Sequence, residues 1–338
     1  MRLQSQVVES RSLTSGAPSG VIVEVTMRSI LTRVLLTIPV VWVVVSLVFL
    51  LIHLVPGDPV QQMLGEGATA ADVATLRHQN GLDLPLHTQY LHYWRDVLHG
   101  DLGRSIRLND TVVHLIATRY PYTIELTVAA LILGLILAVP AGVAASVRRG
   151  RWQDQSIGLI SLFGLSVPAF ALGPVLILVF SISLGWLPVS GAGQSGLFSA
   201  EGWKYLVLPS AAMGVSLAAI LTRMVRTAML EELNRDYIRT ARAKGLSETA
   251  VVYRHALPNA LVPIVTVVGL QFGALLAGAI VTETIFSWPG LGRLVVTAIS
   301  GRDYALVQGS LLAIGLTYVL VNLLTDLTYR LVNPRMRG

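Results

Sequence analysis

Six stretches of apolar, nearly charge-free residues divide this chain of 338 residues. Each is roughly 20 residues or longer, the length that an α-helix needs to cross a hydrocarbon layer of about 30 Å. Proline and glycine recur within the stretches, and membrane helices tolerate them because neighbouring helices satisfy the freed backbone groups. The ten-residue alternation of a transmembrane β-barrel is not visible. The pattern therefore predicts an all-α membrane protein with six transmembrane helices, at residues 34–54, 126–147, 157–184, 205–222, 256–282 and 305–325.

Composition supports the membrane assignment. Hydrophobic residues make up 53 % of the chain and charged residues only 13 %, whereas a soluble globular protein carries about a quarter charged residues. The chain has no cysteine, which excludes disulfides and cysteine-based zinc, haem and iron–sulfur sites.

The basic residues predict the orientation. Arginines cluster before the first stretch, at 148–151, through 223–254 and at the C-terminus, whereas acidic residues outnumber arginines in the long segment 56–120. Short loops rich in Lys and Arg remain in the cytoplasm. Both termini are therefore predicted to be cytoplasmic in a multi-pass protein of the inner cell membrane. The formal net charge of +6 then reflects topology rather than a nucleic-acid-binding surface.

Four regions follow from this topology. Residues 1–27 are predicted to be a disordered cytoplasmic tail, and either Met1 or Met27 fits as the start. Residues 28–55 hold the first transmembrane helix. Residues 56–120 form an extracytoplasmic insertion, where we expect short helices packed on the outer face. Residues 121–338 form the transmembrane core.

The segment 236–258 does not fit a membrane span. Residues 236–243 predict a short helix, and Gly245 is its expected stop because glycine accepts the left-handed conformation cheaply. Ser247 suits the N-terminus of a second short helix, and Pro258 suits the opening turn of the fifth span. Ile238, Ala241 and Gly245 share one helical face. The segment is thus predicted to project from the cytoplasmic face as a helix–turn–helix, with small residues where a groove could close over it.

A second interpretation is a basic segment held by anionic membrane lipid. It explains the arginines of the segment. It does not explain Ala241, Ala243 and Gly245, nor the fixed distance from Gly245 to the pair Leu257-Pro258.

The same segment resembles the cytoplasmic EAA loop of ABC-importer permeases. That loop has Glu-Ala-Ala, three residues, Gly, nine residues, Ile, one residue and Leu-Pro. Here Arg239-Thr240-Ala241 is followed at the same spacing by Gly245, His255 and Leu257-Pro258. Arg in place of Glu and His in place of Ile also occur in the peptide-importing branch. Further stretches similar to that branch are LLIHLVPGDP, GDLGRS, LSVPAFALG, LGWLPVSG and FSWPGLGRL, so that the resemblance covers about residues 27–334.

The resemblance implies a permease subunit of a dipeptide or oligopeptide ABC importer with the type I permease fold. Such a subunit pairs with a second, homologous permease, with two cytoplasmic ATP-binding subunits and with an extracytoplasmic protein that delivers the peptide. ATP and Mg²⁺ bind to the ATPase subunits, and no cofactor binds to the permease directly. The EAA loop would be the coupling helix that docks on an ATPase, and the FSWPGLGRL loop would lie at the outer mouth of the path. The implied coupling residues are Tyr237, Arg239, Thr240, Ala241, Arg242, Ala243, Lys244, Gly245, Leu246, Leu257 and Pro258, and the outer gate candidates are Phe286, Trp288, Pro289 and Gly290.

Other functions have weaker signals. A Walker-type phosphate loop is absent from the sequence, so ATP hydrolysis is assigned to partner subunits and the chain is not expected to be an enzyme. A secondary transporter would need a buried carboxylate relay and usually inverted repeats, and an intramembrane protease would need paired catalytic groups within the spans. The motifs are shared by importers of peptides, nickel and other small solutes, so nickel remains the alternative substrate.

Individual polar residues and glycines in the spans carry further expectations. Glu125, Glu283 and Asp326 lie near predicted helix ends, where a capping or interfacial role is favoured over substrate binding. Five of the seven histidines lie in residues 56–120 without a tight two-ligand spacing, so no metal site is predicted. Glycines 269, 273 and 278 of the fifth span suit close contact with the second permease.

Overall fold

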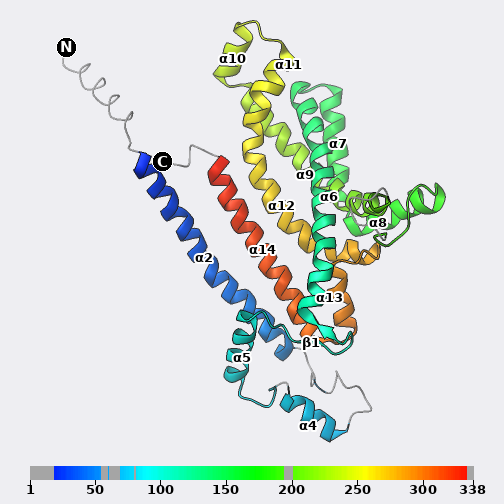
Figure 1. Ribbon diagram of the computed structural model, residues 1–338. Helices are drawn as coiled ribbons and strands as arrows, with labels where there is room; N and C mark the ends of the chain where they lie inside the picture. The colour runs from blue at the N-terminus through cyan, green and yellow to red at the C-terminus, as the bar shows by residue number, and fades with distance from the viewer. Residues whose placement is uncertain (1–18, 55–59, 61–68, 80, 194–200, 333–338) are drawn as a thin grey trace.

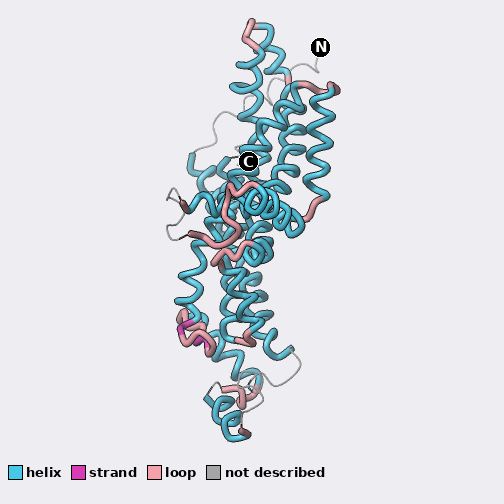
Figure 2. The backbone as a smooth tube through the Cα atoms, turned by 90° about the vertical axis from the view of Figure 1, so that its right-hand side faces the viewer, coloured by secondary structure: helices cyan, strands magenta, loops and turns pink. Residues whose placement is uncertain are grey.

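The computed structural model describes residues 19–54, 60, 69–79, 81–193 and 201–332. Helices make up nearly all of this part of the chain, and loop segments gather at the two ends and near the middle (Figure 2). A two-stranded antiparallel hairpin pairs Arg104 with Thr111.

The helices and strands follow one another along the chain in this order. The elements are α2 Ser19–Leu54, α4 Ala70–Gln79, α5 Leu86–Leu98, β1 Arg104–Ser105, β2 Asp110–Thr111, α6 Val112–Val147, α7 Trp152–Ser166, α8 Ala169–Leu176, the π-helix η1 Ile177–Ser183, α9 Gly202–Leu233, α10 Asp236–Ala243, α11 Glu248–Ala250, the π-helix η2 Val251–Ala256, α12 Leu257–Ile285, α13 Leu291–Ser300 and α14 Tyr304–Val332.

The molecule is elongated along its long helices (Figure 1). Helices α10 and α11 lie at one end, and α4, α5 and the hairpin lie at the other. The start of α2 and the end of α14 point toward the α10 end. The short helices α4 and α5 fall within the segment predicted to be extracytoplasmic.

Five of the six predicted spans correspond to single long apolar helices, but the third is broken. Helices α7 and α8–η1 are bent by 98° across a short break. The prediction of one continuous helix over 157–184 is therefore wrong. Pro168 explains the break, because a proline disfavours helical backbone at the preceding residue, and Val167 is extended with φ −92° and ψ 114°.

Several helices begin or end beyond their predicted limits. Helix α2 begins at Ser19, so that residues 19–27 of the predicted tail are helical, whereas residues 1–18 and the turn 56–59 lie outside the described residues. Helix α6 begins at Val112, inside the segment 56–120, where the side chain of Thr111 accepts a hydrogen bond from the His114 N–H. Hydropathy detects only the apolar part of a helix, so polar helix ends outside that part were not predicted.

Helix α9 is the centre of the bundle. Its most apolar window is 67 % buried, against 17–33 % for the other long helices, and it packs on α6, α7, α8 and α12. Glycine allows α6 to approach closely, since a Cβ at Gly142 would lie 2.6 Å from the Cβ of Val225. Small residues commonly permit such contacts between membrane helices.

The glycines of the fifth span contact this chain's own last helix. A side chain at Gly269 would collide with Thr325, and one at Gly273 would lie 2.9 Å from Tyr318, both on α14. A Cβ at Gly278 would meet no atom of the described residues within 4 Å. The expected contact with a second permease is thus open only at Gly278, because α14 occupies the other two positions.

Asp303 ties the hairpin to the start of α14. Its carboxylate accepts hydrogen bonds from the Ser105 hydroxyl at 2.5 Å and from the Leu306 N–H at 3.2 Å. Ser105 closes the GDLGRS stretch noted in the sequence. At the opposite end of α14, Asp326 pairs with Arg33 of α2.

Candidate functional site

The turn between α10 and α11 has the predicted glycine stop. Helix α10 spans Asp236–Ala243, and Gly245 has φ +80°. The Gly245 N–H donates to the Arg242 carbonyl at 2.9 Å, and the Leu246 N–H donates to the Ala241 carbonyl at 3.3 Å. These two bonds form a Schellman motif, which satisfies the carbonyls at a helix C-terminus. Ser247 caps α11 by accepting from the Ala250 N–H at 3.3 Å, as its position predicts.

An ion pair braces the same turn. The guanidinium of Arg242 donates to both carboxylate oxygens of Glu248, at 2.7 and 3.2 Å. A two-point arginine–carboxylate contact fixes orientation as well as distance. Arg242 therefore holds α10 against α11 and is not simply a surface charge.

Tyr237 joins α10 to two membrane helices. Its hydroxyl donates to the Glu232 carboxylate of α9 at 2.6 Å and accepts from the Asn259 amide of α12 at 3.1 Å. Asn259 also donates to the His255 carbonyl at 2.9 Å. Partial burial, followed by the bond to Glu232, raises the pKa of Tyr237. This set of contacts, Tyr237 with Glu232 and Asn259, is called the tyrosine clamp below.

Burial separates the inner and outer faces of α10. Ile238 and Ala241 are buried, and Ile238 belongs to the same core cluster as Val251 and Val252 of η2. The predicted small face is thus partly wrong, because Ala241 packs inside this chain and is not free for a groove. Of the predicted coupling residues, Leu257 is half-buried, and the exposed ones are Tyr237, Arg239, Thr240, Arg242, Ala243, Lys244, Gly245, Leu246 and Pro258.

The fifth span begins earlier than Pro258. Pro258 does lie in the opening turn of α12, but the π-helix η2 precedes α12 without a break. Proline lacks an N–H and its ring clashes with the carbonyl four residues earlier. The wider π-helical turn just before Pro258 accommodates this defect.

The outer loop is packed inside the chain. Phe286 and Trp288 are each 2 % exposed, which differs from the expectation that both face an outer mouth. The Trp288 ring N–H donates to the Tyr122 carbonyl at 2.8 Å. Pro289 is half-buried and Gly290 is buried. Within this chain the four residues anchor the loop between α12 and α13.

Glu283 is the centre of that anchor. Its buried carboxylate accepts from the Thr123 hydroxyl at 2.6 Å and from the Arg293 N–H at 2.9 Å, near the start of α13. Thr123 in turn accepts from the Leu291 N–H at 2.7 Å. A side chain at Gly290 would collide with this carboxylate. The predicted capping role of Glu283 is confirmed, although it caps a neighbouring helix.

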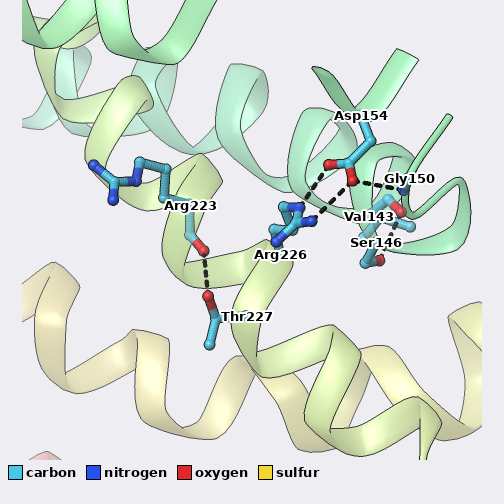
Figure 3. Close-up of polar contacts among 7 residues, drawn as sticks. All are labelled: Val143, Ser146, Gly150, Asp154, Arg223, Arg226 and Thr227. Atoms are coloured by element: carbon cyan, nitrogen blue, oxygen red, sulfur yellow. Dashed lines mark hydrogen bonds and ion pairs between the residues drawn. The ribbon is translucent and has the colours of Figure 1, made fainter. Parts of the chain in front are cut away.

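Sequence reasoning missed a polar contact on α9. The Asp154 carboxylate at the start of α7 binds the Arg226 guanidinium at 2.6 and 2.8 Å and accepts from the Gly150 N–H at 2.9 Å (Figure 3). Arg223, one turn away, points in another direction (Figure 3). In the sequence both arginines contributed only to the charge bias, and their spacing carries no signal of a partner 72 residues away.

Metal-ligating side chains are scattered in the described part of the chain. No three His, Asp or Glu residues there gather in an arrangement that could hold a metal ion. His78 contacts Asp83 at 2.8 Å, and this hydrogen bond raises the pKa of His78.

Known proteins resemble nearly the whole chain. Residues 130–338 match the family described as binding-protein-dependent transport system inner membrane component, and residues 26–127 match the N-terminal part of such membrane components. The chain is 44 % identical over 311 residues to the glutathione transport system permease protein GsiC of Salmonella typhimurium (strain LT2), covering 92 % of this chain and 99 % of that protein. The identity to GsiC of Escherichia coli (strain K12) is 43 % with the same coverage. The inward-facing MetNI methionine ABC transporter has a chain of similar fold, with a TM-score of 0.55 and 20 % identity over 65 % of this chain and 96 % of that one.

Proposed function

Because this chain belongs to the family of binding-protein-dependent transport system inner membrane components, it is a permease subunit of an ABC importer and not an enzyme, and we propose that its substrate is a peptide. The relatives that carry this proposal are glutathione permeases, similar over 92 % of the chain. Glutathione is a tripeptide. The stretches GDLGRS and FSWPGLGRL of this chain resemble the peptide-importing branch of permeases, and this resemblance agrees with a peptide substrate.

The substrate class is testable on the external binding protein that serves this permease. We expect isothermal titration calorimetry to show binding of glutathione or of a tripeptide such as triglycine. Free Ni²⁺ titrated in parallel should give no heat of binding. Binding of Ni²⁺ without binding of any peptide would replace the proposed substrate by the metal.

The partners follow from the same proposal. A second permease completes the path, two cytoplasmic subunits bind ATP and Mg²⁺, and the external protein delivers the peptide. Helix α10 and the turn that follows it dock on one ATPase through the residues between Tyr237 and Leu246 that are exposed. The Schellman turn, the Arg242–Glu248 pair and the tyrosine clamp support this role, since a docking element must transmit force without unfolding.

The orientation proposed for the membrane places both termini in the cytoplasm. The arginine-rich linkers lie at the α10 end, toward which α2 begins and α14 ends (Figure 1). Helices α4 and α5 then lie outside. This arrangement puts α10 on the side where ATP is available.

A single cysteine tests the docking proposal. The chain has no native cysteine, so Ala243→Cys supplies its only thiol at an exposed position of α10. We expect this thiol to form a cross-link with a cysteine placed in the ATPase groove, seen as a heavier band on a gel. Ala241→Cys is the matched control, because Ala241 is buried and its thiol should not cross-link. Free reaction of Ala243→Cys with a soluble thiol reagent in the assembled importer, without any cross-link, would contradict docking.

A further inference from the structure

A cavity of about 480 Å³ lies between α7, α9 and α12. Its floor is one face of α9, on which positions 220, 223, 224, 227, 228 and 231 follow helical spacing. Leu165 at the end of α7 and Pro263 and Ile264 of α12 form apolar walls. The volume falls within the range of small-molecule sites, about 300–1,000 Å³.

Arg223 places an unsatisfied positive charge in this cavity. Its side chain forms no ion pair or side-chain hydrogen bond with any described residue, whereas Arg226, three positions later, binds Asp154 at two points. Arg223 lies one residue past the predicted span 205–222, in the part of α9 that continues toward α10, where an arginine faces water or pairs with an anion. Arg223 is exposed and, unlike Arg226, is not held by a carboxylate of the described chain, so its guanidinium is available to an anion from outside this chain.

Glu231 places the opposite charge in the same cavity. It also lacks an ion pair within the described residues. The two charged residues are eight positions apart on one face of α9, which corresponds to about 12 Å along a helix. An extended tripeptide spans at most about 10 Å, and flexible Arg and Glu side chains bridge the difference.

We propose that this cavity is a transient binding site for the zwitterionic backbone of a short peptide in the transport path. Arg223 binds the terminal carboxylate, and Glu231 binds the terminal ammonium group. This inference rests on the proposed function and deepens it. A site that binds the two ends of a peptide selects ligands with a free carboxylate and a free amine at a set separation. Because the walls between the two charges are apolar, the site accepts peptides with different side chains.

Other occupants are less suited to the two charges. An anionic lipid headgroup would satisfy Arg223 and would be repelled by Glu231. A carboxylate of the second permease would satisfy Arg223 and leave Glu231 without a partner. Of these three occupants, only the peptide carries both complementary charges.

Uptake of labelled triglycine and of its C-terminal amide into proteoliposomes tests the site. The assembled importer is compared with Arg223→Gln, Arg223→Lys and Arg149→Gln, the last removing an equal charge in an exposed cytoplasmic linker. We expect Arg223→Gln to slow triglycine uptake about tenfold, the effect of losing a charge-assisted hydrogen bond. Arg223→Lys and Arg149→Gln should keep most of it. Stimulation of ATP hydrolysis by the loaded binding protein should persist in all three.

The amide identifies what Arg223 binds. The binding protein is common to all assays, so its own preference cancels when variant and unaltered importers are compared with the same peptide. Arg223→Gln should therefore change uptake of the amide less than twofold. An equal loss for both peptides would overturn the proposal. If neither importer transports the amide, the comparison of Arg223→Lys with Arg223→Gln on triglycine decides, and equal rates overturn it.

Failure of the site and failure of the proposed function give different results. If the unaltered importer takes up triglycine and Arg223→Gln does so at the same rate, only the binding site is wrong. If the unaltered importer takes up neither triglycine nor glutathione, peptide import is wrong and the site falls with it. Loss of the second permease from purified Arg223→Gln would assign Arg223 to the contact between permeases instead.

Discussion

Replacing Gly245 with valine is expected to abolish uptake while the chain still inserts and binds its partner permease. Gly245 has φ +80°, a conformation that costs other residues roughly 1–2 kcal/mol and is worse for β-branched ones. The Schellman bonds of the turn depend on it. A side chain at this position meets no described residue within 4 Å, so a steric effect would come from a partner seated against the turn. The measurement is uptake in proteoliposomes together with co-purification of the ATPase subunits.

Asparagine at position 245 separates backbone strain from bulk. Asparagine accepts positive φ more readily than valine, so Gly245→Asn should keep the turn and lose docking only if the groove excludes a side chain. Lipid anchoring predicts a mild Gly245→Val and a damaging Arg239→Gln. Arg239 is the better residue for that comparison, since its side chain is 73 % exposed whereas Arg242 also braces the turn. Uptake within twofold of normal in Gly245→Val would rule out the docking role.

Replacing Glu283 with alanine is expected to destabilise the packing of α13 against α6 and α12 by several kilocalories per mole. The change leaves the Arg293 N–H and the Thr123 hydroxyl without their buried acceptor, at roughly 1–3 kcal/mol for each such group. Glu283→Gln keeps the shape and an acceptor oxygen and should be milder. Thermal unfolding of the detergent-purified protein, followed by size-exclusion chromatography, measures the difference.

A double variant tests the geometry of the anchor. Gly290→Ala should be nearly as damaging as Glu283→Ala, since its methyl group collides with the Glu283 carboxylate. Removing that carboxylate removes the collision, so the double variant should lose less stability than the sum of the two single changes. Strict additivity would show that the two residues do not share this contact.

Local backbone preferences made the structure of the segment 236–258 predictable. Gly245, Ser247 and the helix limits of α10 follow from backbone preferences within a few residues of each position. The six apolar stretches likewise revealed the long helices, because apolar length is a property of the chain itself.

Features set by distant residues were not predictable. The sequence predicts Trp288 as an interfacial residue, because its burial depends on Tyr122 and on core residues that are distant in the sequence. Ala241 was predicted to be available to a partner's groove, but it lies in the same buried cluster as Val251, which follows the turn. Pro168 was recognised as tolerable in a membrane helix, and hydropathy alone does not distinguish a tolerated proline from one that turns the chain by 98°.

The tyrosine clamp has a mechanical consequence. Because one hydroxyl bonds the last turn of α9 and the first turn of α12, a displacement of α10 that keeps these bonds moves both spans together. Helix α9 has 32 residues, about 48 Å in length, and tilting a rod of that length by about 5° carries its far end about 4 Å. A small tilt at the α10 end is therefore amplified along α9 into a displacement of several ångströms at the other end of the helix.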